Sequence, residues 1–563
     1  MPQSELSGAR VASIVGRTPG ADELERAFFA SKAERTHVDG DAWTIEVTPD
    51  RLDLLSEGGL GLALQGILGL AHGRPPLVAP SAPRSVAIRA DASVAPLRAE
   101  IGAIVVHAPP TSPMDAGLLA EAIRFQEILH ATVGYDRRLA SLGIYPLDRL
   151  RPPFAYRAEP MADVTFLPLD GNAPVTADAF FASHPLAVRY GTLGRSGTTC
   201  LTLRDAEARV LSLPPILNSR DAGEARIGDR TLLLESTGTR AARVEEALGL
   251  LLLVFAARGW SAEPVRIERS GSIDEGRAIL AGRVLPLTAA RLATVGGHAY
   301  SAPEIERWVG RARLGVRPAP HGFLVDVPPW RPDLLTEVDV IEDVVLARGV
   351  RSDDGLVLPS ATRGRHRAES RFRSRVHDLL LGLGSSPLYT PVLSPRWAVE
   401  RLGRSASVIA LTNPVSEELA FVRDTLAIPL LGVLARNTRH GYPQRFHEVA
   451  AVVVRDPGAE TGAATRYHAG LFLAHDTAGF ADAAAQVDYL VRAFGAAGVR
   501  EPHEIPGTIP GRAARLRIAG ETVAEMGEIR PSILASLGVP VPVAWAEVDL
   551  TALWPLIRPE EMD

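Results

Sequence analysis

The sequence has almost no cysteine or lysine: Cys200 and Lys32 are the sole examples among 563 residues. A single cysteine excludes an internal disulfide and fits a reducing cytoplasm. The scarcity of lysine removes the usual candidate for a Schiff base or a lysine general base at nearly every position. Cys200 stands in a strand-like run, so we interpret it as a small core residue.

Long hydrophobic runs and an excess of positive charge are also missing. The longest apolar run, 248–257, is far too short for a membrane span, so we expect no membrane partner. The first five residues have neither a basic start nor an apolar stretch, so we expect no signal peptide. The net charge of -6 excludes a uniformly basic nucleic-acid binder. With 46% hydrophobic residues, the composition predicts a soluble, cytoplasmic protein of three to five domains.

The sequence does contain a crowded group of acids in segment 328–343. Five carboxylates fall within eleven residues of an otherwise apolar stretch. Three prolines exclude helix before Asp333. Thr336, with Asp339 three residues later, then predicts a capping box at the start of a helix.

Three of these acids are expected to share one helix face. Asp339, Glu342 and Asp343 lie at i, i+3 and i+4, and like charges so placed repel unless a cation or a basic side chain joins them. Oxygen ligands of this kind suit magnesium. A solvated helix start, where acids favour the helix dipole, explains the same spacing, and spacing alone leaves both interpretations open.

A second segment, 43–56, has the same order of features as 322–335. Each contains an alternating strand, a proline turn, an arginine, an aspartate, two leucines and the start of a helix. An internal duplication explains this order. The chance recurrence of a common strand–turn–helix unit explains it equally well. Both explanations stay open on the sequence alone.

Two strings in the middle of the chain place polar groups beside apolar ones. In 211–219, two prolines set an extended path before Asn218 and Ser219. In 232–239, Glu235 follows an apolar strand. Polar groups at strand ends above an apolar floor are typical of ligand pockets, although each string alone also fits a surface loop.

The segment 330–343 resembles the most recognisable stretch of the phenylalanine–tRNA ligase beta-subunit family. It reads Trp-Arg-Pro-Asp, a short spacer, then Glu-Val-Asp-Val-Ile-Glu-Asp. Segments 133–154, 211–219 and 232–239 are similar to the editing domain of that family in its archaeal and eukaryotic form. Segment 411–450 is similar to the family's catalytically inactive copy of a class II synthetase core. The resemblance covers nearly the whole chain.

This resemblance implies partners, a cofactor and metal ligands. The chain would pair with an alpha subunit in an α2β2 assembly that attaches phenylalanine to its tRNA, and the alpha subunit would hold the site for ATP and phenylalanine. Magnesium is bound in the family by four acidic positions. In this chain they are Asp333, Asp339, Glu342 and Asp343.

The resemblance also implies that the second module hydrolyses tyrosine wrongly attached to the phenylalanine tRNA. An apolar pocket rejects the extra hydroxyl of tyrosine only about a hundredfold, whereas a pocket that hydrogen-bonds it selects strongly in the other direction. Glu235 is the candidate acceptor for that hydroxyl. Candidates for orienting the ester or an attacking water are Ser212, Asn218 and Thr237. Arg240 departs from the family, which usually has an acidic residue there.

The last module is expected to lack chemistry of its own. An active class II core needs an arginine–glutamate pair on adjacent strands and a late glycine-rich motif, and the sequence shows no such motif. Arg423 and Glu448 are therefore expected to be structural relics, and Arg530 stands where the family usually has histidine. His184, in the second module, is also expected to be structural.

These observations predict an α+β multidomain protein with four modules. They are an N-terminal α/β module with a proline-rich linker (1–85), an editing domain (86–266), a small magnesium-site domain of helical or winged type (267–358) and an inactive class II synthetase-like core on an antiparallel sheet (359–563).

The leading hypothesis is a phenylalanine–tRNA ligase beta subunit that also edits tyrosyl-tRNA. A free-standing aminoacyl-tRNA hydrolase and a non-catalytic RNA- or protein-binding paralogue are the alternatives. A magnesium-dependent phosphotransferase ranks last, because the sequence shows no glycine loop with a lysine to cradle phosphate.

Overall fold

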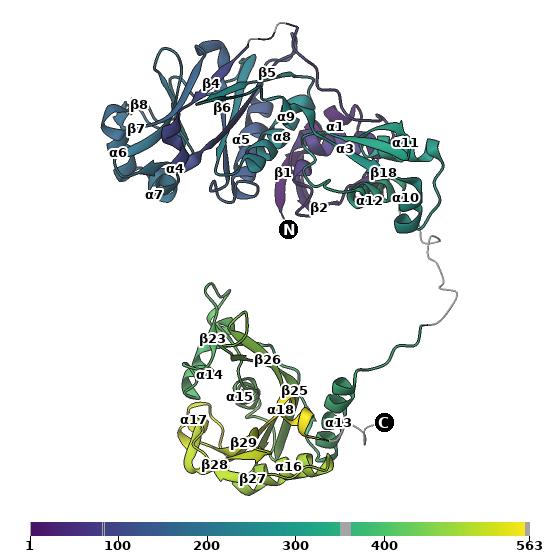
Figure 1. The fold of residues 1–563 in the computed structure, drawn as a ribbon, viewed down its shortest axis with the longest axis vertical. Helices are drawn as coiled ribbons and strands as arrows, with labels where there is room; N and C mark the ends of the chain where they lie inside the picture. Colours follow the sequence, from purple (N-terminus) through teal and green to yellow (C-terminus); the bar gives the residue numbers. More distant parts are fainter. Residues whose placement is uncertain (1, 82, 84, 350–361, 558–563) are drawn as a thin grey trace. The chain divides into compact units, whose positions relative to one another are not determined.

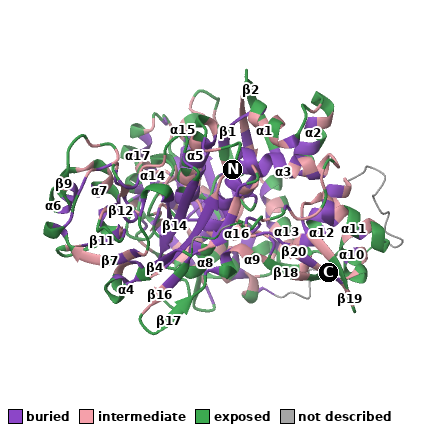
Figure 2. Ribbon diagram, turned by 90° about the horizontal axis from the view of Figure 1, so that it is seen from above, coloured by how far each residue is buried: buried purple, intermediate pink, exposed green. Residues whose placement is uncertain are grey.

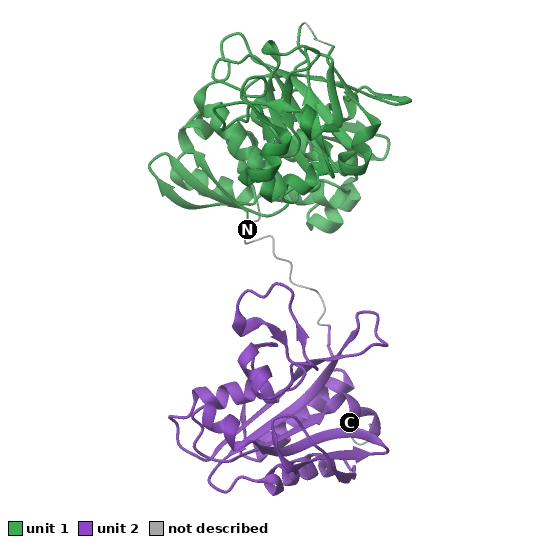
Figure 3. Ribbon diagram, turned by 90° about the vertical axis from the view of Figure 1, so that its left-hand side faces the viewer, with its two compact units in different colours: residues 1–357 green, residues 358–563 purple. Residues whose placement is uncertain are grey.

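The computed structural model describes residues 2–81, 83, 85–349 and 362–557. The chain divides into two compact units, Met1–Val357 and Leu358–Asp563 (Figure 3). Both units combine helices with β-sheets, so the predicted α+β class is confirmed at this level. The predicted boundary between residues 358 and 359 lies outside the described residues. Within the described ranges, no helix is long and apolar enough to cross a membrane.

The first unit begins with a small module on a three-stranded antiparallel sheet, in the order β1-β3-β2 (Figure 1). Two helices connect β1 to β2, and a 3-10 turn leads from β3 into a third helix. In chain order, the elements are β1 (Gln3–Ser7), α1 (Gly8–Val15), α2 (Ala21–Ala30), β2 (Ala33–Asp39), β3 (Ala42–Val47), η1 (Leu52–Leu55) and α3 (Glu57–Ile67).

A later module, 283–348, repeats this plan. Its sheet order is β18-β20-β19, two helices connect β18 to β19, and a tight turn leads from β20 into a third helix. In chain order, the elements are β18 (Arg283–Leu287), α10 (Ala289–Gly296), α11 (Ala302–Arg311), β19 (Gly315–Ala319), β20 (Gly322–Val327) and α12 (Glu337–Arg348).

Equivalent side chains make equivalent hydrogen bonds in the two modules. Glu57 opens α3, and its Oε1 accepts the backbone N–H of Ser7, the cap of α1, at 3.1 Å. Glu337 opens α12, and its Oε1 accepts the backbone N–H of Thr288, the cap of α10, at 2.6 Å. The chance recurrence of a local strand–turn–helix unit does not explain why both glutamates bind the cap of a helix about 50 positions earlier in the chain. The structure therefore favours duplication, and we refer to 2–67 and 283–348 as the first and second repeats.

Between the repeats lies a middle module with two sheets. One is four-stranded and antiparallel, in the order β15-β5-β14-β6, with helices α5 and α8 packed against it. The other has the order β13-β12-β11-β7-β4-β16-β17, with β10 beside β11. The elements are β4 (Ala87–Ala90), β5 (Glu100–His107), α5 (Ala116–Ala131), β6 (Ala140–Pro146), β7 (Phe154–Pro160), β10 (Arg195–Ser196), β11 (Thr199–Arg204), β12 (Val210–Leu213), β13 (Leu217–Asn218), β14 (Thr231–Gly238), α8 (Ala241–Ala256), β15 (Ser261–Pro264), β16 (Arg266–Arg269) and β17 (Ser272–Asp274).

Strand β14 is buried along its whole length (Figure 2). Leu232 and Leu234 belong to the hydrophobic cluster that includes α5 and α8, whereas Leu233 belongs to the cluster that includes the second sheet. Because side chains alternate along a strand, Glu235 and Thr237 lie on the same face as Leu233. The interior between the two sheets therefore receives both polar side chains.

The second unit is built on a seven-stranded sheet in the order β21-β25-β26-β30-β29-β28-β27, antiparallel except where β21 meets β25. Leu471 and Leu473 of β26 pack in a cluster with α13 and α16, whereas Phe472 packs in a cluster with α15. Both faces of the sheet are thus covered. The elements are α13 (Ala368–Gly382), β21 (Ser386–Pro387), α15 (Ala427–Arg436), β25 (Gln444–Arg455), β26 (Ala463–Ala474), α16 (Phe480–Ala493), β27 (Val499–Pro502), β28 (Thr508–Ile518), β29 (Glu521–Ile529) and β30 (Val543–Asp549).

Helix α8 brings the middle module against the acidic segment. The long apolar run of the sequence lies in this helix, and its leucines are fully buried. A Cβ built on Gly249 would stand 2.4 Å from the carbonyl oxygen of Pro329. The helix and the proline turn therefore approach more closely than any side chain at position 249 allows.

Gly249→Ala is expected to lower the free energy of unfolding of the first unit by about 1–3 kcal/mol, because the Pro329 backbone must shift to admit the methyl group. Denaturant titration followed by tryptophan fluorescence measures the change. The control is Gly382→Ala, another helical glycine, which has nothing within 4 Å of the added carbon and should be neutral or stabilising. Equal stability of Gly249→Ala and the parent would contradict the close approach.

Candidate functional site

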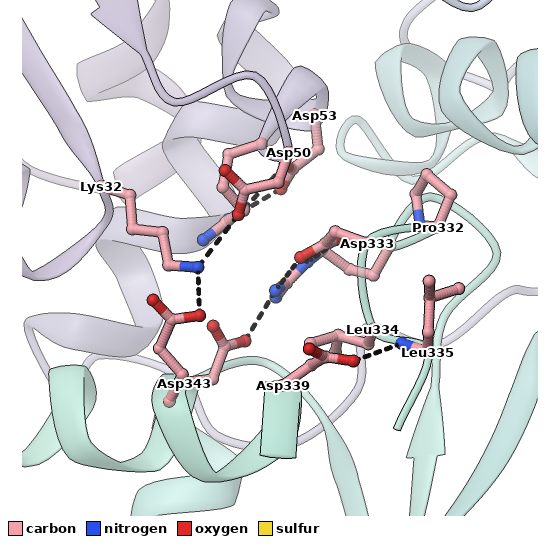
Figure 4. Close-up of polar contacts among 12 residues, drawn as sticks. Lys32, Asp50, Asp53, Pro332, Asp333, Leu334, Leu335, Asp339 and Asp343 are labelled. Carbon is pink, nitrogen blue, oxygen red and sulfur yellow. Dashed lines mark hydrogen bonds and ion pairs between the residues drawn. The ribbon is translucent and has the colours of Figure 1, made fainter. Parts of the chain in front are cut away.

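The acidic segment 328–343 forms a proline turn followed by the start of α12. Thr336 caps the helix, and the Asp339 side chain returns to the backbone just before it. Asp339 Oδ2 accepts the N–H groups of Leu335 at 2.9 Å and Thr336 at 2.7 Å (Figure 4). The predicted turn and capping box are confirmed, and Asp339 serves the cap.

Arg331 holds two other acids of the predicted metal site. Its guanidinium donates to Asp333 at 2.9 Å from Nε and at 2.7 Å from Nη2, and Nη2 also donates to Asp343 at 2.7 Å. All three side chains are at most 5% exposed. Burial alone would raise the pKa of Asp333, but the Arg331 guanidinium outweighs it and lowers that pKa below its usual value.

The fourth predicted ligand, Glu342, meets the lysine of the first repeat. Lys32 Nζ donates to Glu342 Oε2 at 2.7 Å and to Asp50 Oδ2 at 3.0 Å. Figure 4 shows Lys32 pointing toward Asp50 of its own repeat, whereas the bond to Glu342 reaches the second repeat. Burial opposes the charged ammonium, but the hydrogen bonds to Glu342 and Asp50 raise the pKa of Lys32 above its usual value.

A second arginine–aspartate pair lies beside the first. Arg51 donates to Asp53 from Nε at 2.9 Å and from Nη2 at 2.8 Å, so the first repeat reproduces the bidentate pair of the second. Burial and the neighbouring Arg331 lower the pKa of Arg51, but Asp53 and Asp343 raise it more. The two pairs and Lys32 therefore form one ionic group at the joint between the repeats.

The ion pairs of the four acids decide whether a magnesium ion fits among them. Magnesium requires near-octahedral oxygen ligands at about 2 Å and dehydrates reluctantly. Among the described residues, no three His, Cys, Asp or Glu side chains come together as a metal-binding group. A guanidinium and an ammonium stand among the four acids instead, and both repel a divalent cation. The observed arrangement does not fit an ion held by all four acids, and the magnesium site stays a prediction.

A second candidate site lies between the two sheets of the middle module. Glu235 on β14 is paired in register with Gly143 on β6. The Tyr145 hydroxyl donates to Glu235 Oε2 at 3.0 Å and lies 2.9 Å from Ser212 Oγ. A Cβ on Gly143 would stand 2.3 Å from that hydroxyl, so only glycine at this position leaves room for the Tyr145 side chain.

Burial shifts the acid–base behaviour of Glu235. It raises the pKa of this carboxyl to about 7, although the Tyr145 hydroxyl, the Arg98 guanidinium and the Thr237 hydroxyl oppose the shift. The second oxygen, Oε1, is buried and meets no donor at hydrogen-bonding geometry. A buried carboxyl near neutrality with one unused oxygen is able to bind a hydroxyl group or to exchange a proton.

The other predicted pocket residues lie near Glu235 to different degrees. Thr237 follows it by two residues on the same face of β14, and Ser212 is linked to it through the Tyr145 hydroxyl. Asn218 pairs with Ser212 in the second sheet, but its amide donates to the carbonyl oxygen of Gly223 at 3.1 Å. The same amide also donates to the carbonyl oxygen of Ile144 on β6 at 3.4 Å, so Asn218 links its own loop to the strand that carries Tyr145.

Tyr145 is the residue that sequence reasoning missed. It stands in the family-like string 133–154, but a tyrosine among apolar neighbours is typical of a core position. Its burial is nearly complete, at 1% exposed. A buried tyrosine hydroxyl needs a partner, but Glu235 stands 90 positions away in the sequence, so no local pattern indicated the contact.

Two other residues have structural roles, as predicted. The His184 side chain caps α7 (Pro185–Tyr190) and stacks on Phe180, with ring centroids 4.5 Å apart. Cys200 is fully buried, and burial raises the pKa of its thiol to about 12. A thiol so protonated is a poor nucleophile.

In the second unit, Arg423 and Glu448 form an ion pair at 3.1 Å, and neither side chain is more than 2% exposed. Thr390 Oγ1 accepts from Arg423 at 2.8 Å and donates to Glu448 at 2.5 Å. A pair enclosed in this way binds a nucleotide only if these contacts break. The geometry agrees with a structural role.

Two family models match the chain. Residues 356–550 match the phenylalanyl tRNA synthetase beta chain CLM domain. Residues 285–350 match the tRNA synthetase B5 domain. The second match coincides with the second repeat and its acidic segment.

Relatives match along the whole chain. The phenylalanine–tRNA ligase beta subunit of Methanothrix thermoacetophila is 29% identical over 557 residues, which cover 97% of this chain and 98% of the relative. That of Aeropyrum pernix is 28% identical, with 98% and 99% covered. The fold of an N-terminal fragment of the phenylalanyl-tRNA synthetase beta subunit from Pyrococcus horikoshii matches with a TM-score of 0.58 at 23% identity, covering 62% of this chain and 100% of the fragment.

Arg331→Met is expected to lower the free energy of unfolding by about 3–5 kcal/mol near neutral pH, because it leaves two buried carboxylates without their cation. The lowered pKa of Asp333 means that the pair stabilises the fold above about pH 4 and that this contribution is lost as the pH falls through the lowered value. Parent and variant should therefore differ less in acid than at neutral pH. Denaturant titrations at both pH values measure the difference.

The control for this prediction is Arg317→Met. Arg317 is 54% exposed and stands 3.8 Å from Asp326, so its removal should change stability little. Equal losses for the two variants, or a loss in Arg331→Met that does not depend on pH, would contradict the ionic account.

Proposed function

Because this chain belongs to the family of phenylalanine–tRNA ligase beta subunits, we propose that it supports the ATP-dependent attachment of phenylalanine to its tRNA within the assembled enzyme. The observation that carries the proposal is that the relatives match this chain over nearly its whole length and theirs. Beta subunits from three archaea match 96–98% of this chain and 98–99% of their own length. A match confined to one domain would support only a shared module.

The proposed division of labour places adenylation on an alpha subunit in an α2β2 enzyme of the cytoplasm. The Arg423–Glu448 pair supports this division, because both side chains are buried and both are already hydrogen-bonded to the Thr390 hydroxyl. The chain would then contribute the assembly surface, part of the tRNA-binding surface and an editing site.

For the editing site, we propose that Glu235 accepts the hydroxyl of a mis-attached tyrosine. Its Oε2 already accepts a tyrosine hydroxyl from the chain itself, which is the same chemical contact, and its Oε1 meets no donor. Phenylalanine offers no hydroxyl and would leave this buried oxygen unpaired. A water is the proposed nucleophile, with Ser212, Asn218 and Thr237 as the proposed orienting groups.

The same interior sets a condition on this activity. Ser212, Glu235 and Tyr145 are each at most 2% exposed. A substrate side chain therefore reaches Glu235 only when the space between the two sheets opens. Tyr145, which lies against the carboxylate, is the side chain that it displaces or joins.

Co-expression with the alpha subunit of the same genome tests the main proposal. We expect the two chains to co-purify and to charge phenylalanine tRNA together, whereas neither charges it alone. Attachment is measured with radiolabelled phenylalanine and purified tRNA. A chain that ignores the alpha subunit and hydrolyses tyrosyl-tRNA by itself would support the free-standing hydrolase instead.

Glu235→Ala tests the editing site in the co-purified enzyme. Clearance of tyrosyl-tRNA should fall at least about tenfold, because the acceptor of the tyrosine hydroxyl is gone, while phenylalanine attachment stays within about twofold. The control is Glu263→Ala, which removes a buried carboxylate bonded to His107 at 2.7 Å on another strand of the same sheet. Equal clearance by Glu235→Ala and the parent would end the assignment.

A further inference from the structure

Lys32 is the single lysine of the chain, and both its backbone conformation and its low exposure are unfavourable for a lysine. It follows Ser31, the C-cap of α2, and has a φ of +61°, in the left-handed region that favours glycine. Its side chain is only 12% exposed, although a lysine usually keeps its ammonium in water. The Nζ atom lies 2.7 Å from Glu342 and 3.0 Å from Asp50.

These contacts join the two repeats. Lys32 and Asp50 belong to the first repeat, and Glu342 lies 310 positions later in α12 of the second. Counted from the shared arginine–x–aspartate motif, α3 of the first repeat has Leu62 where α12 has Glu342. The acid is thus particular to the second repeat, and the ammonium that meets it comes from the first.

The ammonium binds the one acid of the predicted metal site that Arg331 and the backbone do not bind. Arg331 binds Asp333 and Asp343, and Asp339 is bound by backbone N–H groups. Glu342 is the remaining acid of the predicted metal site, and Lys32 binds it. A magnesium ion at Glu342, which is 56% exposed, must displace Lys32 and leave the ammonium of a side chain only 12% exposed without one of its two carboxylates, which costs free energy.

We propose that Lys32 takes the place of a magnesium ion at this acidic face. Its tethered ammonium bridges Glu342 and Asp50 and closes the joint between the repeats without free metal. A compact ammonium with three donors suits two carboxylates at this spacing. Because it is part of the chain, its local concentration exceeds that of a free ion, and it has no octahedral shell of water to lose.

Thermal unfolding of the full-length chain after dialysis against EDTA tests this proposal. Magnesium should shift the midpoint of the parent by less than about 1 °C relative to sodium chloride of equal ionic strength. Lys32→Met keeps the length and the left-handed backbone but removes the charge, and its midpoint should fall by about 2 °C. Magnesium should restore that midpoint, and calorimetry should show at least a tenfold gain in magnesium affinity over the parent.

Two further variants sharpen the test. Lys32→Arg keeps a cation and should behave as the parent does. Lys32→Met combined with Glu342→Gln removes the carboxylate and should lose the response to magnesium. The proposal is overturned if magnesium stabilises the parent as much as it stabilises Lys32→Met, or if Lys32→Met neither loses stability nor gains affinity.

The parent alone decides the question should Lys32→Met fail to fold, because tight magnesium binding by the parent contradicts the proposal and its absence supports it. These measurements follow stability and metal affinity, so they stand apart from the test of phenylalanine attachment.

Discussion

A buried guanidinium between two carboxylates holds the acidic turn to the helix that follows it. Arg331 binds Asp333 in the turn and Asp343 in the second turn of α12, with all three side chains at most 5% exposed. The turn supplies Pro329 to α8 of the middle module, and α12 supplies Glu342 to the first repeat. The first repeat, the middle module and the second repeat therefore meet around this one contact. Truncating a buried charge pair costs several kcal/mol because the partner stays behind unpaired.

The same unit contains another buried acid, Glu235, whose pKa is shifted in the opposite direction to that of Asp333. At the joint between the repeats, the Arg331 guanidinium lowers the pKa of Asp333, and Lys32 binds Glu342. Between the two sheets of the middle module, Arg98 opposes the effect of burial on Glu235 without overcoming it, and the pKa of Glu235 rises to about 7. Acids with environments this different have different uses. The first group joins the two repeats, and the second suits the editing role that we propose for Glu235.

The local features of both sites could be predicted from the sequence. The proline turn, the Thr336 cap, helix α8 and the strand that carries Glu235 follow from residue patterns within a few positions. The partners could not, because they come from far along the chain. Lys32 stands 310 positions before Glu342, and Tyr145 stands 90 positions before Glu235. No period or cap relates such residues, and only the duplicated Arg–x–Asp motif indicated that the two distant segments share a geometry.

The central claim is that side-chain cations of the chain itself hold the acidic segment. Its most direct test is a crystal structure of the chain with its alpha subunit, soaked in manganese and measured at the manganese absorption edge. Manganese prefers the same oxygen ligands as magnesium, and its anomalous signal locates it without ambiguity. The account predicts no anomalous peak among Asp333, Asp339, Glu342 and Asp343, with Lys32 Nζ near 2.7 Å from Glu342. A peak coordinated by these acids, with Lys32 turned away, would contradict it.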